Sequence, residues 1–134
     1  IMQGVSFVIN IISKDKVRIE YRSFKLKKEI EQAKVLNRND SKELIKRLND
    51  LKILKWKDYY EPKEKMILDG ISWSIDIDTY NLGMINKRGN NEFPNNWHEF
   101  RNFRRWIVER LREILLNYNN FYLFFHIEKK VKLW

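Results

Sequence analysis

The stretch from residue 69 to residue 97 constrains the fold most, because it holds two different backbone patterns in a row. It begins with Asp69-Gly70, a pair that favours a tight turn since glycine adopts positive φ without steric cost. Residues 71–78 then alternate apolar and polar side chains, as a strand with one buried face does. Residues 89–94 form a loop rich in glycine, asparagine and proline, and Asn95-Asn96 is suited to cap a helix. The stretch therefore predicts a strand hairpin followed directly by a helix.

A second hairpin is predicted at the start of the chain. Residues 5–12 and 17–22 both contain alternating apolar positions, and residues 13–16 between them are polar. Residues 24–39 are charged and weakly periodic, so we expect a loop or a frayed helix there. Residues 57–65 are expected to be a polar connection. Residues 121–127 are apolar on both faces, which predicts a buried strand.

Two segments have the periodicity of an amphipathic helix. Behind the capping pair Asp40-Ser41, residues 41–52 carry leucines at helical spacing. The longest helix is expected over residues 96–116. Its apolar stripe consists of Phe100, Phe103, Ile107, Leu111 and Ile114.

The order hairpin, helix, hairpin, helix, strand predicts an α+β fold. We expect a two-layer sandwich in which an antiparallel sheet of about four to five strands carries two main helices on one face, in the order ββαββα plus a C-terminal strand. A length of 134 residues is that of one domain, and we assign residues 1–134 to it. Five Trp, six Tyr and eight Phe predict an aromatic core.

The segment from residue 44 to about residue 111 resembles a family of small, poorly characterised bacterial proteins. Its members carry a leucine-rich helix, a Trp, a strand D-G-x-x-W-x-L-x-I and a loop G-x-N-x-Y-P-x-N-aromatic before a helix. The matching residues here are Leu51, Trp56, Asp69, Gly70, Trp73, Ser74, Ile75, Ile77, Gly89, Asn91, Phe93, Pro94, Asn96, Trp97 and Phe100. Phe93 replaces the usual Tyr. The resemblance implies no activity, so it carries over no catalytic residue, and we expect structural roles for the motif, with Trp73 in the core.

The chain is basic, with 27 Lys and Arg against 18 Asp and Glu and a net charge of +9. Such a surplus favours polyanions or acidic proteins as partners, although AT-rich coding bias explains it equally well. At helical spacing Arg101, Arg105 and Arg112 share one narrow sector of the last helix. We predict a basic binding face made of Lys87, Arg88, Arg101, Arg104, Arg105, Arg112, Lys129, Lys130 and Lys132. Trp97 and His98 lie near one end of it, where a base could stack.

A weaker constellation consists of Asp76 and Asp78 with His98 and Glu99. The two aspartates share a strand face about 7 Å apart, a spacing that a divalent metal or an acid–base pair could use. Acids on the solvated face of a half-buried strand are the ordinary alternative. The pattern H-E-x-x-H is absent from the chain, and the other histidine, His126, lies in an apolar strand segment.

Several classes of function are excluded by missing motifs. The chain has no phosphate-binding glycine loop, no dinucleotide fingerprint and no nucleophile elbow, and its lack of cysteine excludes thiolate chemistry. We therefore expect no cofactor and a non-enzymatic protein. No run of 18 apolar residues predicts a membrane span, and the first residues do not resemble a signal peptide. A cytoplasmic location is expected.

Three functional hypotheses remain open. The first is a binding or inhibitor protein whose basic face engages nucleic acid or a nucleic-acid-handling protein, as a phage or mobile-element inhibitor such as an anti-CRISPR protein does. The alternative is an immunity-type module that neutralises a toxin through exposed aromatic residues, namely Trp56, Tyr59, Tyr60 and Trp134. A second alternative is a metal-dependent nuclease that uses Asp76, Asp78 and His98.

Overall fold

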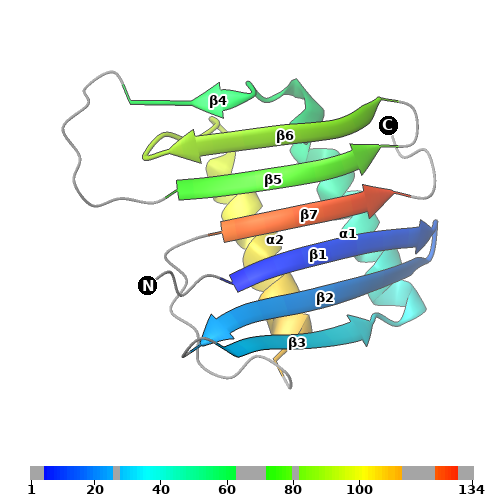
Figure 1. Cartoon of the computed structure of the whole chain (residues 1–134). Coiled ribbons are helices and arrows are strands. Elements are labelled where there is room, and N and C mark those ends of the chain that lie inside the picture. The colour runs from blue at the N-terminus through cyan, green and yellow to red at the C-terminus, as the bar shows by residue number, and fades with distance from the viewer. Residues whose placement is uncertain (1–4, 26–27, 63–71, 80–81, 113–122, 130–134) are drawn as a thin grey trace.

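A computed structural model describes residues 5–25, 28–62, 72–79, 82–112 and 123–129, and it has two layers (Figure 1). One layer is a β-sheet, and the other is a pair of helices that cover one face of it. The elements in chain order are β1 (Val5–Ser13), β2 (Lys16–Lys25), β3 (Lys28–Val35), α1 (Arg38–Leu51), the 3₁₀ turn η1 (Ile53–Lys55), β4 (Tyr59–Tyr60), β5 (Ser72–Thr79), β6 (Gly83–Asn90), α2 (Trp97–Arg110) and β7 (Leu123–Lys129). The predicted α+β class and the placement of both helices on one face are confirmed.

The sheet is larger than expected and mixed in direction. It has seven strands in the order β3-β2-β1-β7-β5-β6-β4. The hairpins β1–β2 and β5–β6 are antiparallel, as predicted. However, β7 is inserted between them and runs parallel to both β1 and β5, and β4 runs parallel to β6. An apolar segment suits this central position, because a strand with neighbours on both sides and a helix layer above it is the most enclosed.

Two strands lie where the sequence predicted none. β3 occupies half of the segment expected to be a loop or a frayed helix, and β4 lies within the expected polar connection. Both are edge strands of the sheet. Edge strands commonly carry charge and can be very short, so alternation and apolar content reveal them poorly.

The core lies between the sheet and the helices. Alternate residues of β1, β2 and β5 face the helices and are buried, as their period of two predicts. The helices add the predicted apolar stripes, and Trp106 is buried as well. The buried strand residues are Phe7, Ile9, Ile11, Val17, Ile19, Tyr21, Trp73, Ile75 and Ile77, and the helical ones include Leu44, Leu48, Phe100, Phe103, Ile107 and Leu111. Ile114 lies outside the described residues.

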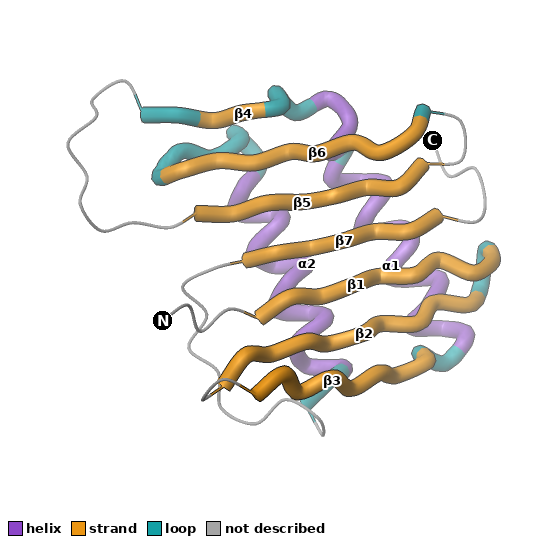
Figure 2. The backbone as a smooth tube through the Cα atoms, viewed as in Figure 1, coloured by secondary structure: helices purple, strands orange, loops and turns teal. Residues whose placement is uncertain are grey.

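The other face of the sheet, which we call the open face, has no helix over it in the described parts of the chain. In Figure 2 all seven strands lie in front of both helices. The intervening strand positions, such as Arg18, Ser74 and Arg88, are half-buried or exposed there. Neither α1 nor α2 is long and apolar enough to span a membrane, and the described residues contain no other α-helix.

The start of α1 differs from the predicted cap, whereas α2 has its N-cap at Asn96, within the predicted pair. Asn37, not Asp40-Ser41, caps α1, since its side chain accepts a hydrogen bond from the Asp40 amide at 2.7 Å. Ser41 is fully buried, and its hydroxyl accepts a bond from the Val17 amide at 3.1 Å, which ties α1 to β2. Asn96 precedes α2, but its side chain donates to the Leu51 carbonyl at 2.9 Å and so connects the two helices.

Candidate functional site

The motif block forms an aromatic cluster in the core at the N-terminal end of α2. Trp97 lies between three rings, with centroid distances of 4.7 Å to Trp73, 4.9 Å to Phe93 and 4.8 Å to Phe100. Trp73 is 2% exposed, and its indole N–H donates to the Glu92 carbonyl at 2.8 Å. These residues have structural roles, as expected from the motif. Trp97 is therefore packed between other rings, and its position does not favour the predicted stacking on a base.

The cluster also buries two of the aromatic residues that were predicted to be exposed to a partner. Trp56 and Tyr60 are 8% and 9% exposed, because both turn toward Trp73 at ring distances of 5.9 Å and 5.7 Å. The prediction that they form an exposed interface is therefore wrong. Tyr59 faces the other way and is 43% exposed, and Trp134 lies outside the described residues.

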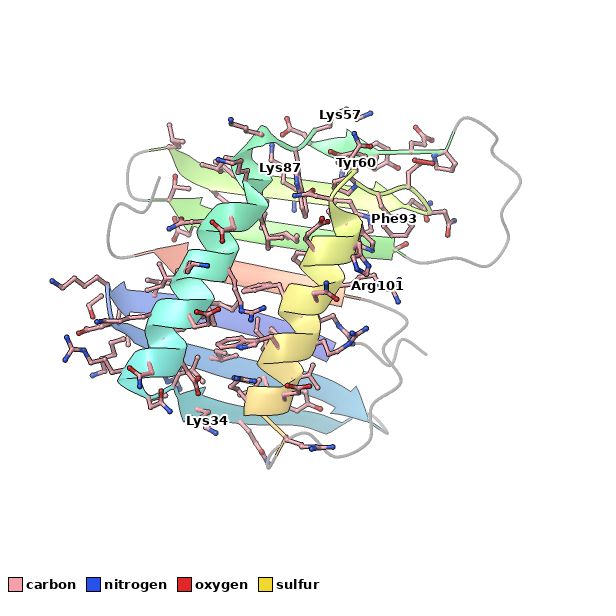
Figure 3. The ribbon with its side chains drawn as sticks, turned by 180° about the vertical axis from the view of Figure 1, so that it is seen from behind. Lys34, Lys57, Tyr60, Lys87, Phe93 and Arg101 are labelled. Carbon is pink, nitrogen blue, oxygen red and sulfur yellow. The ribbon has the colours of Figure 1, made fainter. Side chains whose placement is uncertain are left out.

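Lys87 was predicted on the basic face, but it is buried at 5% exposure. It lies opposite Ile75 in the hairpin, so strand alternation turns its side chain toward the helix layer (Figure 3). The ammonium donates to the Trp56 carbonyl at 2.8 Å and to the Asp58 carboxylate at 2.7 Å. That hydrogen bond and the positive charge hold the pKa of Asp58 below its ordinary value of 3.8. Lys87 thus joins β6 to the segment before β4. The hairpin register pairs Lys87 with the buried residue Ile75, so its inward direction could have been inferred from the sequence.

Three arginines of α2 and Arg112, which lies in the turn after the helix ends at Arg110, make up a set that we call the α2 arginine face. It consists of Arg101, Arg104, Arg105 and Arg112. In Figure 3, Arg101 projects from the side of α2 that faces away from α1. Arg101, Arg105 and Arg112 are exposed, and Arg104 is partly buried. Within the described ranges, none of the four has a carboxylate within ion-pair distance.

Glu109 of α2 is an acidic side chain that could neutralise part of this surface. Its carboxylate instead accepts from Arg110 at 3.4 Å, and Arg110 also lies 3.7 Å from Asp40 and 4.3 Å from the Trp106 ring. Arg110 therefore pairs with Glu109 and Asp40, on the side of α2 that faces α1. Glu113, the acid that follows Arg112 in the sequence, lies outside the described residues.

Arg104 is in a less favourable electrostatic environment than its neighbours. Burial, and secondarily the charge of Arg101, lowers the pKa of its guanidinium. Its Nε atom is buried and has no hydrogen-bond partner among the described residues. A buried donor without an acceptor is unfavourable, so an anion bound beside Arg104 would relieve both effects.

The rest of the predicted basic face is dispersed. Arg88 lies on the open face, on the far side of the sheet from α2, where its guanidinium is 5.1 Å from the Tyr59 ring centroid. Lys129 ends β7, and Lys130 and Lys132 lie outside the described residues. The structure therefore brings together four of the nine predicted residues.

The predicted metal or acid–base constellation is not assembled. Asp76 and Asp78 lie on the open face of β5, whereas His98 and Glu99 belong to α2 on the opposite side of the sheet. Asp76 accepts a hydrogen bond from the Asn86 amide at 2.6 Å. In the described portions of the chain, no three His, Cys, Asp or Glu side chains are grouped so that they could hold a metal ion.

A cavity of about 340 Å³ lies between the two helices, and the sequence did not predict it. Two of its three charged lining residues are already paired, and the third is Glu99. Arg47 is 2.9 Å from Glu43 and lies over the Trp106 ring, and Asp50 is 3.6 Å from Lys46. This pairing leaves few groups to recognise a ligand there.

Comparison with known proteins yields no matching family model, curated protein or solved structure. The resemblance of residues 44–111 to small bacterial proteins stays a prediction, and any functional argument depends on the geometry described above.

Proposed function

We propose that this protein is a non-enzymatic binding protein that engages a polyanionic surface through the α2 arginine face. The partner is nucleic acid or the acidic surface of a nucleic-acid-handling protein. An inhibitor carried by a phage or mobile element, such as an anti-CRISPR protein, belongs to the class that this proposal describes. The observation that carries it is the set of three exposed guanidiniums, Arg101, Arg105 and Arg112, none paired with a carboxylate of the described chain.

The spacing of the arginines suits a linear array of anionic groups. At 1.5 Å per residue, Arg101 and Arg105 are separated by about 6 Å along the helix axis, and Arg112 follows in the turn beyond the last helical residue, Arg110. Each guanidinium can bind a phosphate or carboxylate with two parallel hydrogen bonds. The net charge of +9 adds a long-range attraction that would accelerate association with a polyanion.

Charge reversal in Arg101→Glu/Arg105→Glu tests the proposal. The matched control is Lys42→Glu/Lys46→Glu, which changes the net charge equally at the same spacing on the exposed side of α1. Tagged wild-type protein and both variants are used for affinity capture from host-cell lysate, with and without nuclease, at low and high salt. We expect the arginine variant to capture at least about tenfold less material than the wild type, because charged hydrogen bonds contribute about 1.5–3 kcal/mol each. Equal capture by the two variants would contradict the proposal.

The two kinds of partner give different results in the same experiment. Nucleic acid that disappears on nuclease treatment and at high salt indicates direct binding, since phosphate contacts weaken steeply with salt. A protein that is retained after nuclease treatment, but lost from the arginine variant, indicates an acidic protein surface.

The immunity-type alternative has one observation in its favour. Five large apolar or aromatic side chains are exposed among the described residues, namely Ile12, Val35, Tyr59, Leu82 and Met84. Two of them, Tyr59 at 43% and Met84 at 57%, line one hollow of the open face. A partner held by such contacts would stay bound at high salt and would tolerate Arg101→Glu/Arg105→Glu. Aspartate substitution at Met84 and Tyr59 would then release it.

A further inference from the structure

A second surface with the chemistry of an anion site lies on the open face, away from α2. The strands β4, β6 and β5 lie side by side (Figure 2). Residues of these three strands line a hollow of about 470 Å³. Its polar lining is built by strand register, since Arg88 of β6 lies opposite Ser74 of β5 on one side and Tyr59 of β4 on the other. Asn90, two residues further along β6, closes the same side of the hollow.

The hydrogen bonds around the hollow leave donors, not acceptors, available to a ligand. The Ser74 hydroxyl oxygen accepts from the Asn86 amide at 3.0 Å, so its own O–H remains to be donated. The side-chain oxygen of Asn90 accepts from the Ser72 hydroxyl at 3.4 Å, which leaves the amide hydrogens of Asn90. With the N–H groups of Arg88, three side chains present donors to one space.

The charge of Arg88 is also available. It has no ion pair within the described segments, and no carboxylate belongs to the lining of the hollow. Two acids in neighbouring strand positions are otherwise engaged, because Asp58 binds Lys87 at 2.7 Å and Asp76 accepts from Asn86. The ring of Tyr59, 5.1 Å from the guanidinium, restrains Arg88 by a cation–π contact and lowers the entropy that Arg88 would lose on binding.

We propose that this hollow binds the phosphate group of a nucleotide, either as a free monoester or as a diester within a single nucleic-acid strand. Arg88 pairs with the phosphate, Ser74 and Asn90 donate to its remaining oxygens, and Tyr59 lies beside the attached nucleoside. A volume of about 470 Å³ falls within the range of small-ligand sites. The site is on the opposite side of the sheet from the α2 arginine face, so it does not depend on the function proposed above.

Isothermal titration with uridine monophosphate, uridine and a single-stranded oligonucleotide tests this site. The variants are Arg88→Gln, which removes the charge, and Ser74→Ala, which removes a donor without changing the charge. Arg18→Gln is the control, because Arg18 is another arginine of the open face and lies on the distant strand β2. We expect Arg88→Gln to weaken binding of a phosphate-containing probe at least about tenfold and Ser74→Ala severalfold, with Arg18→Gln within about twofold of the wild type.

Binding of uridine monophosphate, but not of uridine, would identify a free nucleotide as sufficient. Binding of the oligonucleotide alone, still dependent on Arg88 and Ser74, would identify a nucleic-acid strand. The proposal is overturned if the wild type binds neither phosphate probe, or if Arg18→Gln weakens binding as much as Arg88→Gln does. Arg101→Glu/Arg105→Glu, measured in the same titration, should retain the uridine monophosphate site, which separates this result from the test of the α2 arginine face.

Discussion

Gly89 permits the close contact on which the aromatic cluster depends, and replacing it with alanine should measure that contact. A Cβ atom at residue 89 would lie 2.4 Å from Nε1 and 2.6 Å from Cε2 of Trp73, and 2.7 Å from the Glu92 carbonyl oxygen. The backbone of Gly89 does not have positive φ. The cost of Gly89→Ala must therefore come from the displaced indole and loop, and not from strain in the strand.

The expected magnitude combines three effects. Overpacking in a close-packed core costs about 1–3 kcal/mol. Moving the indole also breaks its hydrogen bond to Glu92, which contributes about 1 kcal/mol. Alanine regains about 0.5–1 kcal/mol through the lower entropy of the unfolded chain. We expect a net loss of about 2–3 kcal/mol in the free energy of unfolding, which lowers Tm by roughly 10 °C for a domain of this size.

A double-mutant cycle with Trp73→Phe isolates the contact. Urea unfolding followed by tryptophan fluorescence is measured for Gly89→Ala in the wild-type and Trp73→Phe backgrounds. The phenyl ring is smaller and has no N–H to lose from Glu92, so the cost of Gly89→Ala should fall by about 1 kcal/mol or more in the second background. Gly83→Ala is the control. Gly83 has φ of +74°, and a Cβ atom added there would meet nothing within 4 Å, so its cost should be the same in both backgrounds.

An equal cost of Gly89→Ala in the two backgrounds would refute this reasoning. The destabilisation would then come from the Glu92 carbonyl or from the strand backbone. A stabilising effect of Gly89→Ala would show that the loop moves freely and that the ring cluster is not close-packed at this point.

Two further predictions concern polar contacts. The ammonium of Lys87 depresses the pKa of Asp58 below 3.8 in the folded state. The ionised carboxylate therefore stabilises the folded state above pH 3.8, and this stabilisation is lost as the pH falls through the lowered pKa of the folded state. The Tm of Asp58→Asn should therefore lie below that of the wild type at neutral pH and converge with it in acid, and a constant difference would contradict this. Asn37→Ala should destabilise the protein by about 1 kcal/mol in urea unfolding through loss of the α1 cap, whereas Asn37→Asp should retain most of the stability.

The predictions that succeeded concern patterns within single segments. The alternation predicted over residues 71–78 identified both β5, Ser72–Thr79, and the face that it buries. The stripe Phe100, Phe103, Ile107 and Leu111 correctly identified the buried side of α2. These patterns were readable because a strand or helix that buries one face imposes its own period on the sequence.

The candidate sites were predicted less well, because a site depends on which elements become neighbours. Arg88 and Arg101 are both basic and near each other in the chain, yet they lie on opposite sides of the sheet. Asp76 and His98 are separated in the same way. Grouping residues by charge ignored that adjacent strand positions alternate between the two faces, as Lys87 and Arg88 do.

The sequence alone determined the two hairpins, the two amphipathic helices and an aromatic core, since each depends on local periodicity and on how much apolar surface must be buried. Only the tertiary structure decided that β7 enters between the hairpins, that β3 and β4 extend the sheet to seven strands, and that one face stays open in the described parts of the chain. Strand pairing joins backbone groups that are far apart in the chain, and those groups are chemically alike at every residue. The choice of neighbours therefore depends on how the whole layer packs. This choice places the arginines of α2 on one side of the sheet and a separate donor-lined hollow on the other.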